Sequence, residues 1–76
     1  MKKETVEYDS PVDALIAVTK RLSCYEGRYG MASEDFYDKY EKGQIDDSAD
    51  FVEWANDYRH YLTIRLKIEE HLRHVA

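Results

Sequence analysis

The feature that most constrains this chain is a run from Ala49 to Val75 that contains neither glycine nor proline. Apolar residues recur along this run at spacings of three and four, which is the period of an amphipathic α-helix. At a rise of 1.5 Å per residue, a helix over residues 49–75 is roughly 40 Å long. The rest of the chain must therefore pack against one long C-terminal helix.

The apolar side chains of this predicted helix divide into two neighbouring stripes on a helical wheel. The first stripe consists of Phe51, Ala55, Tyr58, Leu62 and Leu66, and the second of Trp54, Tyr61, Ile64, Ile68, Leu72 and Val75. The preceding residues offer only two short helices, which cover a part of this surface. We therefore predict that one stripe is left for a partner. The residues Tyr61, Ile64, Ile68, Leu72 and Val75 are the candidates for self-association in an antiparallel helical dimer.

A first helix is predicted over about residues 11–27. Ser10 has the residue type preferred at an N-cap, and Pro11 suits the first helical position. One apolar stripe follows at spacings of three and four, formed by Leu15, Val18, Leu22, Tyr25 and Tyr29. Gly27 and Gly30 bracket the expected end. The preceding residues 1–9 are expected to form a short extended arm.

A second, short helix is predicted over about residues 34–42, with Ser33 as its cap and Gly43 closing it. Asp47 or Ser48 is expected to cap the long helix. No internal repeat or linker interrupts the chain. The sequence thus predicts a single all-α domain of three helices over residues 1–76.

The charge of the chain favours a protein partner. Asp and Glu number 16 against 11 Lys and Arg, a formal net charge of −5. Binding to a phosphate backbone requires concentrated positive charge, so we expect no direct nucleic-acid binding by this chain alone. An acidic domain is instead attracted to basic protein surfaces. The high tyrosine content also suits an interface, because the ring combines an apolar body with a polar tip.

Cysteine use and hydropathy indicate a cytoplasmic protein. Cys24 is the one cysteine, so an internal disulfide cannot form, and a reducing compartment is the simplest interpretation. Lys2 and Lys3 are not followed by an apolar segment of the kind found in signal peptides, and no stretch of about 18 apolar residues occurs. We expect the protein to be neither secreted nor membrane-bound.

The histidines do not predict a metal site. His71 and His74 lie three residues apart and close to Glu70, but His60 is on the order of 16 Å away along the helix. A metal ion needs three or four convergent ligands, so no metal or other cofactor is expected. Positive side chains in the last turns of a helix are explained by its dipole.

Catalytic candidates are also few. Arg65 and His71 have an R-x5-H spacing that resembles the helical ribonuclease motif of the HEPN families, but Leu66 stands where those families carry a polar residue. A small ribonuclease using this pair is therefore a third alternative. Ser10, Ser33 and Ser48 are explained as helix caps, so the chain is not expected to be an enzyme.

The segment RYGMASEDFYDKYEKGQIDDSADFVEW, residues 28–54, resembles the TumA-like antitoxins that are partners of TumE-family toxins. The matching residues are Arg28, Tyr29, Gly30, Met31, Phe36, Tyr37, Tyr40, Phe51 and Trp54. The resemblance covers about a third of the chain and implies an antitoxin that binds and blocks a cognate protein toxin, which would be basic or nuclease-like.

Combined with the charge pattern, this resemblance gives a set of candidate partner-binding residues. They are Arg28, Tyr29, Met31, Phe36, Tyr37, Asp46, Asp47, Asp50, Phe51, Trp54 and Tyr58. The acidic side chains are expected to attract the partner and the aromatic ones to supply buried area. The alternative for Phe36, Tyr40, Phe51 and Trp54 is that they form the core of the three-helix unit.

Overall fold

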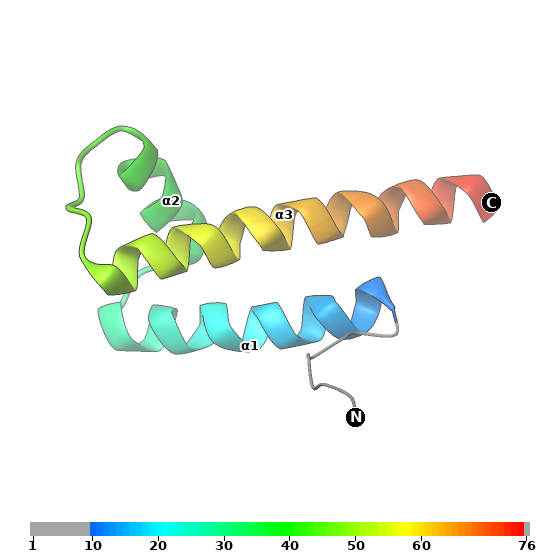
Figure 1. The fold of residues 1–76 in the computed structure, drawn as a ribbon, viewed down its shortest axis with the longest axis horizontal. Helices are drawn as coiled ribbons and strands as arrows, with labels where there is room; N and C mark the ends of the chain where they lie inside the picture. Colours follow the sequence, from blue (N-terminus) through cyan, green and yellow to red (C-terminus); the bar gives the residue numbers. More distant parts are fainter. Residues whose placement is uncertain (1–9, 76) are drawn as a thin grey trace, which may run out of the picture.

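The computed structural model describes residues 10–75, and these residues form the three helices that the sequence predicts. They are α1 (Pro11–Tyr29), α2 (Ser33–Glu41) and α3 (Ala49–Val75). α1 and α3 lie side by side and antiparallel, and α2 packs beside the N-terminal part of α3 (Figure 1). The arm predicted at residues 1–9 lies outside the described residues. None of the helices in the described part is long and apolar enough to cross a membrane.

α1 begins where the sequence predicts and ends two residues later than expected. The Ser10 hydroxyl accepts a hydrogen bond from the Asp13 N–H at 3.3 Å, and Pro11 occupies the first turn. Gly27 lies inside the helix, which continues to Tyr29. Gly30 is the residue that ends it, with a left-handed φ of 65° and an N–H that donates to the Glu26 carbonyl at 2.8 Å. This left-handed conformation is the reason why Gly30, and not Gly27, terminates α1.

Replacing each of these two glycines with alanine should change stability in opposite directions. An added Cβ meets no other atom within 4 Å at either position. At Gly27 alanine reduces the entropy cost of the helix, so stability should rise by about 0.5–1 kcal/mol. At Gly30 the left-handed φ penalises a Cβ, so stability should fall by about 1 kcal/mol. Urea unfolding of both variants measures the difference, and shifts of the same sign would contradict these roles.

The N-terminus of α2 corrects the role predicted for Ser33. Ala32 is the N-cap residue, and Ser33 is the first helical residue. The Ser33 N–H donates to the carboxylate of Glu26 on α1 at 2.9 Å, and its side chain is turned into the interior. A side chain from another helix thus satisfies the first N–H of α2. At α3 the cap is Ser48, whose hydroxyl accepts from the Phe51 N–H at 3.4 Å.

The core lies where the three helices meet. Trp54 of α3 and Phe36 of α2 are completely buried, and their rings stack at 3.9 Å and within 3° of parallel. Tyr25 of α1 stacks on Trp54 from a centroid distance of 5.5 Å. The Trp54 indole N–H donates to the buried Ser33 hydroxyl at 2.9 Å. One tryptophan therefore connects all three helices through both apolar and polar contacts.

The two apolar stripes of α3 face different helices. The second stripe faces α1: Trp54 stacks on Tyr25, Ile64 is buried, and Ile68 and Leu72 line a hollow with the start of α1. The first stripe faces α2 through Phe51 and Tyr58, but α2 is only nine residues long.

This arrangement corrects the stripe assigned to self-association. α1 runs along most of that stripe within the same chain, so Ile64 is buried, and Tyr61 and Ile68 are partly buried. Leu72 is 58% exposed, and the side chain of Val75 lies outside the described residues. The first stripe is also uncovered in part beyond α2, where Leu66 is 59% exposed.

Candidate partner-binding surface

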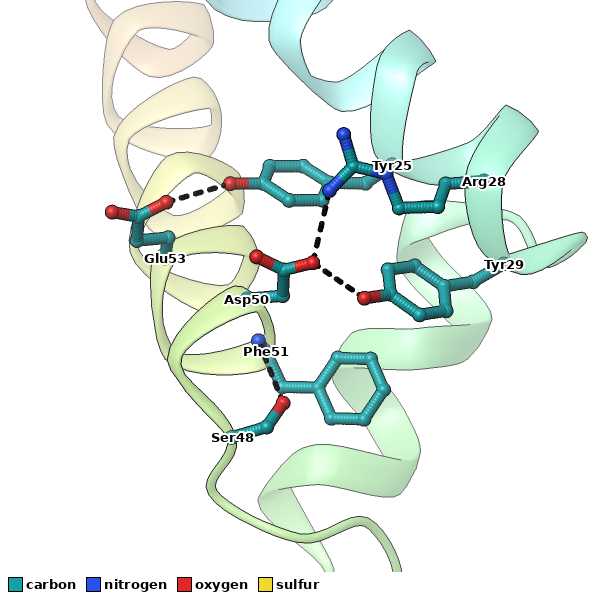
Figure 2. Close-up of polar contacts among 7 residues, drawn as sticks. All are labelled: Tyr25, Arg28, Tyr29, Ser48, Asp50, Phe51 and Glu53. Carbon is teal, nitrogen blue, oxygen red and sulfur yellow. Dashed lines mark hydrogen bonds and ion pairs between the residues drawn. The ribbon is translucent and has the colours of Figure 1, made fainter.

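Three of the predicted partner-binding residues form one polar cluster, which we call the polar junction: Arg28, Tyr29 and Asp50. The Asp50 carboxylate at the start of α3 accepts a hydrogen bond from Arg28 Nη1 at 2.9 Å and another from the Tyr29 hydroxyl, both at the end of α1 (Figure 2). One turn along, the Tyr25 hydroxyl donates to the Glu53 carboxylate at 2.9 Å. These contacts tie the C-terminal end of α1 to the N-terminal end of α3.

The polar junction changes the expected role of Asp50. Hydrogen bonds from Tyr29 and Arg28 hold the pKa of the Asp50 carboxyl below its ordinary value, and the hydrogen bond to Asp50 raises the pKa of both donors. Asp50 therefore stays ionised, but the adjacent Arg28 offsets its charge at 2.9 Å. We therefore expect the attraction of a basic partner to come from acidic side chains that have no arginine beside them. Asp50 instead joins α1 to α3.

Burial, and next the hydrogen bond to Glu53, raises the pKa of Tyr25 to about 12. The unfolded chain releases this proton near pH 10, and the folded chain keeps it up to about pH 12. The stabilising contribution is therefore complete below about pH 10 and is lost as the pH rises through about 10–12.

Tyr25→Phe should consequently lose less stability than the wild type between about pH 9 and about pH 11. Urea unfolding at the two pH values measures this loss. The matched control is Tyr40→Phe, a partly buried tyrosine on α2 outside this cluster. Equal losses in the wild type and in Tyr25→Phe would show that Tyr25 titrates like an ordinary tyrosine.

Aromatic surface lies next to the polar junction. The rings of Tyr29 and Phe51 pack at 5.0 Å and 60° to each other, and Tyr29 is 37% exposed. Met31, in the turn between α1 and α2, is partly buried against the same core. The structure thus brings Arg28, Tyr29, Asp50 and Phe51 together where α1 ends and α3 begins (Figure 2), and Met31 follows in the turn after α1.

Two of the predicted anchors, Phe36 and Trp54, have no exposed surface. They form the stack at the centre of the core, so they cannot contact a partner in this fold. Here the alternative interpretation, that the aromatic residues build the three-helix unit, describes the structure. We therefore remove both residues from the candidate surface.

Tyr37 and Tyr58 form a separate aromatic pair between α2 and the middle of α3. Their rings lie 5.0 Å apart. The Tyr37 hydroxyl accepts from Arg59 Nε at 3.0 Å, and the same guanidinium contacts Glu41 at 3.5 Å. Both tyrosines are partly buried, and these contacts explain their positions within the chain itself.

The remaining candidates, Asp46 and Asp47, are exposed in the connection between α2 and α3. Asp46 accepts from the Ser48 N–H at 3.1 Å. They belong to a concentration of negative charge, because residues 34–57 contain nine carboxylates and two lysines, a net formal charge of −7. We call this segment, which comprises most of α2, the connection and the first third of α3, the acidic end.

The alternative chemical sites do not assemble in the described part of the chain. Within residues 10–73, whose side chains the structure describes, no three His, Cys, Asp or Glu side chains come close enough to hold a metal ion. Arg65 contacts Glu69 at 3.4 Å and lines a hollow with Tyr58 and Tyr61, whereas His71 lines a different hollow with Val12 and Ile68. The ribonuclease alternative therefore gains no support from the geometry of this pair.

Sequence reasoning missed two contacts that organise this region. Glu26 and Ser33 lie seven residues apart on two helices, and Tyr25 and Glu53 lie 28 residues apart. Neither spacing corresponds to a recurrent local pattern, so no sequence signal could have found them. Comparisons with family models, curated proteins and solved structures gave no match to this chain.

Proposed function

We propose that this chain acts by binding another protein, without catalysing a reaction, and that it is a cytoplasmic antitoxin that neutralises a cognate protein toxin by covering its surface. The resemblance of residues 28–54 to TumA-like antitoxins supports the choice of partner class. The acidic end supports a basic surface on that partner, because opposite potentials accelerate encounter and suppress wrong partners.

The observation that carries the proposal is the separation of charge along the molecule. The acidic end carries a net formal charge of −7, more than the whole chain, while residues 58–75 carry four Lys or Arg against two Glu. Ion pairs with Arg21, Arg28 and Arg59 offset part of this charge, at Asp57, Asp50 and Glu41. The exposed acids of α2 and of the connection, Asp46 and Asp47 among them, carry the rest of the negative charge. A basic partner is drawn to this end, where Tyr29 and Phe51 offer a ring surface for contact.

In this arrangement the candidate partner-binding residues have two roles. Asp46 and Asp47 steer the encounter because they are exposed in the connection. Tyr29, Phe51 and Met31 supply apolar area, and Arg28 and Asp50 hold the end of α1 against α3 so that this surface is preformed.

The experiment that tests this function is co-expression of the chain with the product of the neighbouring gene. We expect the two proteins to copurify. We also expect the product of the neighbouring gene to arrest growth when it is expressed alone, and co-expression of the present chain to restore growth. A neighbour that neither binds nor impairs growth would overturn the antitoxin proposal. A partner that binds but is harmless would keep the protein-binding function and exclude its antitoxin role.

Reversing one charge of the acidic end should slow association with this partner. We expect Asp47→Lys to lower the association rate by about tenfold at low salt, with the difference shrinking at high salt. Asp13→Lys is the matched control, because it makes the same charge change at an exposed position near the opposite end of the molecule. Stopped-flow association kinetics measure both, and equal rates for the two variants would exclude steering by the acidic end.

A further inference from the structure

The start of α1 lies beside the last turns of α3, and the two helices enclose a groove between them (Figure 1). This groove, which we call the end groove, has a volume of about 440 Å³. Its apolar lining comes from Pro11 and Val12 on α1 and from Ile68 and Leu72 on α3. Val12 is 52% exposed and Leu72 is 58% exposed, so the groove offers apolar surface of the kind that marks a binding site.

The charged side chains of the end groove are basic. Among the described residues that line it, Lys67 and His71 are the basic ones, and none is acidic. Both side chains are exposed. The end groove therefore suits an occupant that combines apolar side chains with negative charge.

The arm at residues 1–9 has this combination. Residues 4–9, ETVEYD, contain Val6, Tyr8 and three acids, with no lysine or arginine among them. In an extended chain Val6 and Tyr8 lie on the same side, because successive side chains alternate. Thr5 and Glu7 then lie on the opposite side, which leaves two apolar side chains to enter a groove together.

The connectivity of the chain puts the arm at the mouth of the end groove. Ser10, which follows the arm directly, is itself one of the lining residues. The Cα of Tyr8 is within about 7 Å of the Cα of Ser10, and that of Val6 within about 14 Å. Ile68 and Leu72 are one turn apart, about 6 Å along the helix, so both arm side chains have sufficient reach. A short tether also gives an effective concentration on the order of millimolar, and a small apolar contact is then enough to hold the arm.

We propose that the occupant of the end groove is the N-terminal arm of the same chain, with Val6 and Tyr8 against Ile68 and Leu72. The arm then joins the start of α1 to the end of α3. This contact lies beyond the part of α3 that α2 contacts, which extends to Arg59. It gives the end of the molecule farthest from the aromatic core an apolar cluster of its own.

The charge of the groove favours the arm over two other occupants. A second copy of the chain brings another Lys67 and His71, so two end grooves placed together repel each other. A basic protein, the partner that the acidic end suits, is repelled by Lys67 in the same way. The inference does not depend on the antitoxin function, because the tests below use the purified full chain alone.

The first test is nuclear magnetic resonance of the full chain. We expect nuclear Overhauser contacts between the ring protons of Tyr8 and the methyl groups of Ile68 and Leu72, and chemical shifts that do not change on dilution. Tyr8→Ala should shift these methyl resonances, because it removes the ring that lies against them. Thr5→Ala is the matched control, since it changes the opposite side of the arm and should leave the resonances in place.

The second test is a double-mutant cycle measured by urea unfolding. Tyr8→Ala should raise the equilibrium constant of unfolding about fivefold in the wild-type background, and less than about twofold when Leu72→Ala is already present. Leu66→Ala is the control background: this leucine is on the same helix, is 59% exposed and does not line the end groove, so the full effect of Tyr8→Ala should persist there.

Three results would overturn the proposal. Two are the absence of contacts between Tyr8 and the α3 methyl groups, and equal effects of Tyr8→Ala in the two leucine backgrounds. The third is a set of methyl shifts that changes with protein concentration and is unaffected by Tyr8→Ala, which would assign the end groove to a second copy.

Discussion

Trp54→Ala should lower the free energy of unfolding by about 3–5 kcal/mol, the range observed when a large buried aromatic side chain is removed. The ring is completely buried and stacks on Phe36 at 3.9 Å and on Tyr25 at 5.5 Å. A domain of 76 residues has a total stability of roughly 4–11 kcal/mol. The substitution therefore removes a large part of that stability, and the variant should unfold at a much lower urea concentration or be unfolded without urea.

Urea unfolding followed by far-ultraviolet circular dichroism measures this effect, since the variant lacks the tryptophan that fluorescence would report. Val52→Ala is the control, because Val52 is on the same helix two residues away and exposed. Its midpoint should stay close to that of the wild type. If Trp54→Ala unfolded at the midpoint of Val52→Ala, the aromatic stack would not be the centre of the core.

The three helices were predictable because local signals agree with the final packing. The run from 49 to 75 has no helix breaker, and the Ser10-Pro11 start has both preferred residue types, so α3 and the start of α1 match the prediction. The end of α1 did not match. Gly27 and Gly30 are equivalent as sequence signals, and only the turn into α2 determines that Gly30 adopts the left-handed conformation.

The candidate surface was less predictable than the fold. Periodicity shows which side of α3 is apolar, but it cannot show which neighbour covers each stripe or how far along. Phe36 and Trp54 therefore appeared equally suited to a core and to an interface until the stack assigned them to the core. Asp50 looked like one more acid of the connection, and only the approach of α1 gives it Arg28 and Tyr29 as partners.

The same argument applies to Ser33, for which a cap was predicted and a buried hydrogen bond was found. Ser33→Ala should lower stability by about 1–3 kcal/mol, because it leaves the buried Trp54 indole N–H without its acceptor. A lost helix cap would not explain this decrease. Ala32 occupies the N-cap position, and the N–H of residue 33 can still donate to Glu26 in the alanine variant. Urea unfolding of this variant gives its cost.

A double-mutant cycle with Trp54→Phe separates the hydrogen bond from packing. Phenylalanine keeps a ring in the stack but has no N–H, so removing the Ser33 hydroxyl should cost little in that background. We expect an interaction free energy of about 1–2 kcal/mol between the two positions. The corresponding cycle between Trp54→Phe and Ser48→Ala, at the cap of α3, should give a value near zero because Ser48 bonds Phe51 instead. Additive effects in the Ser33 cycle would mean that the hydroxyl acts on α2 alone, and the link between α2 and α3 would then rest on the Phe36–Trp54 stack.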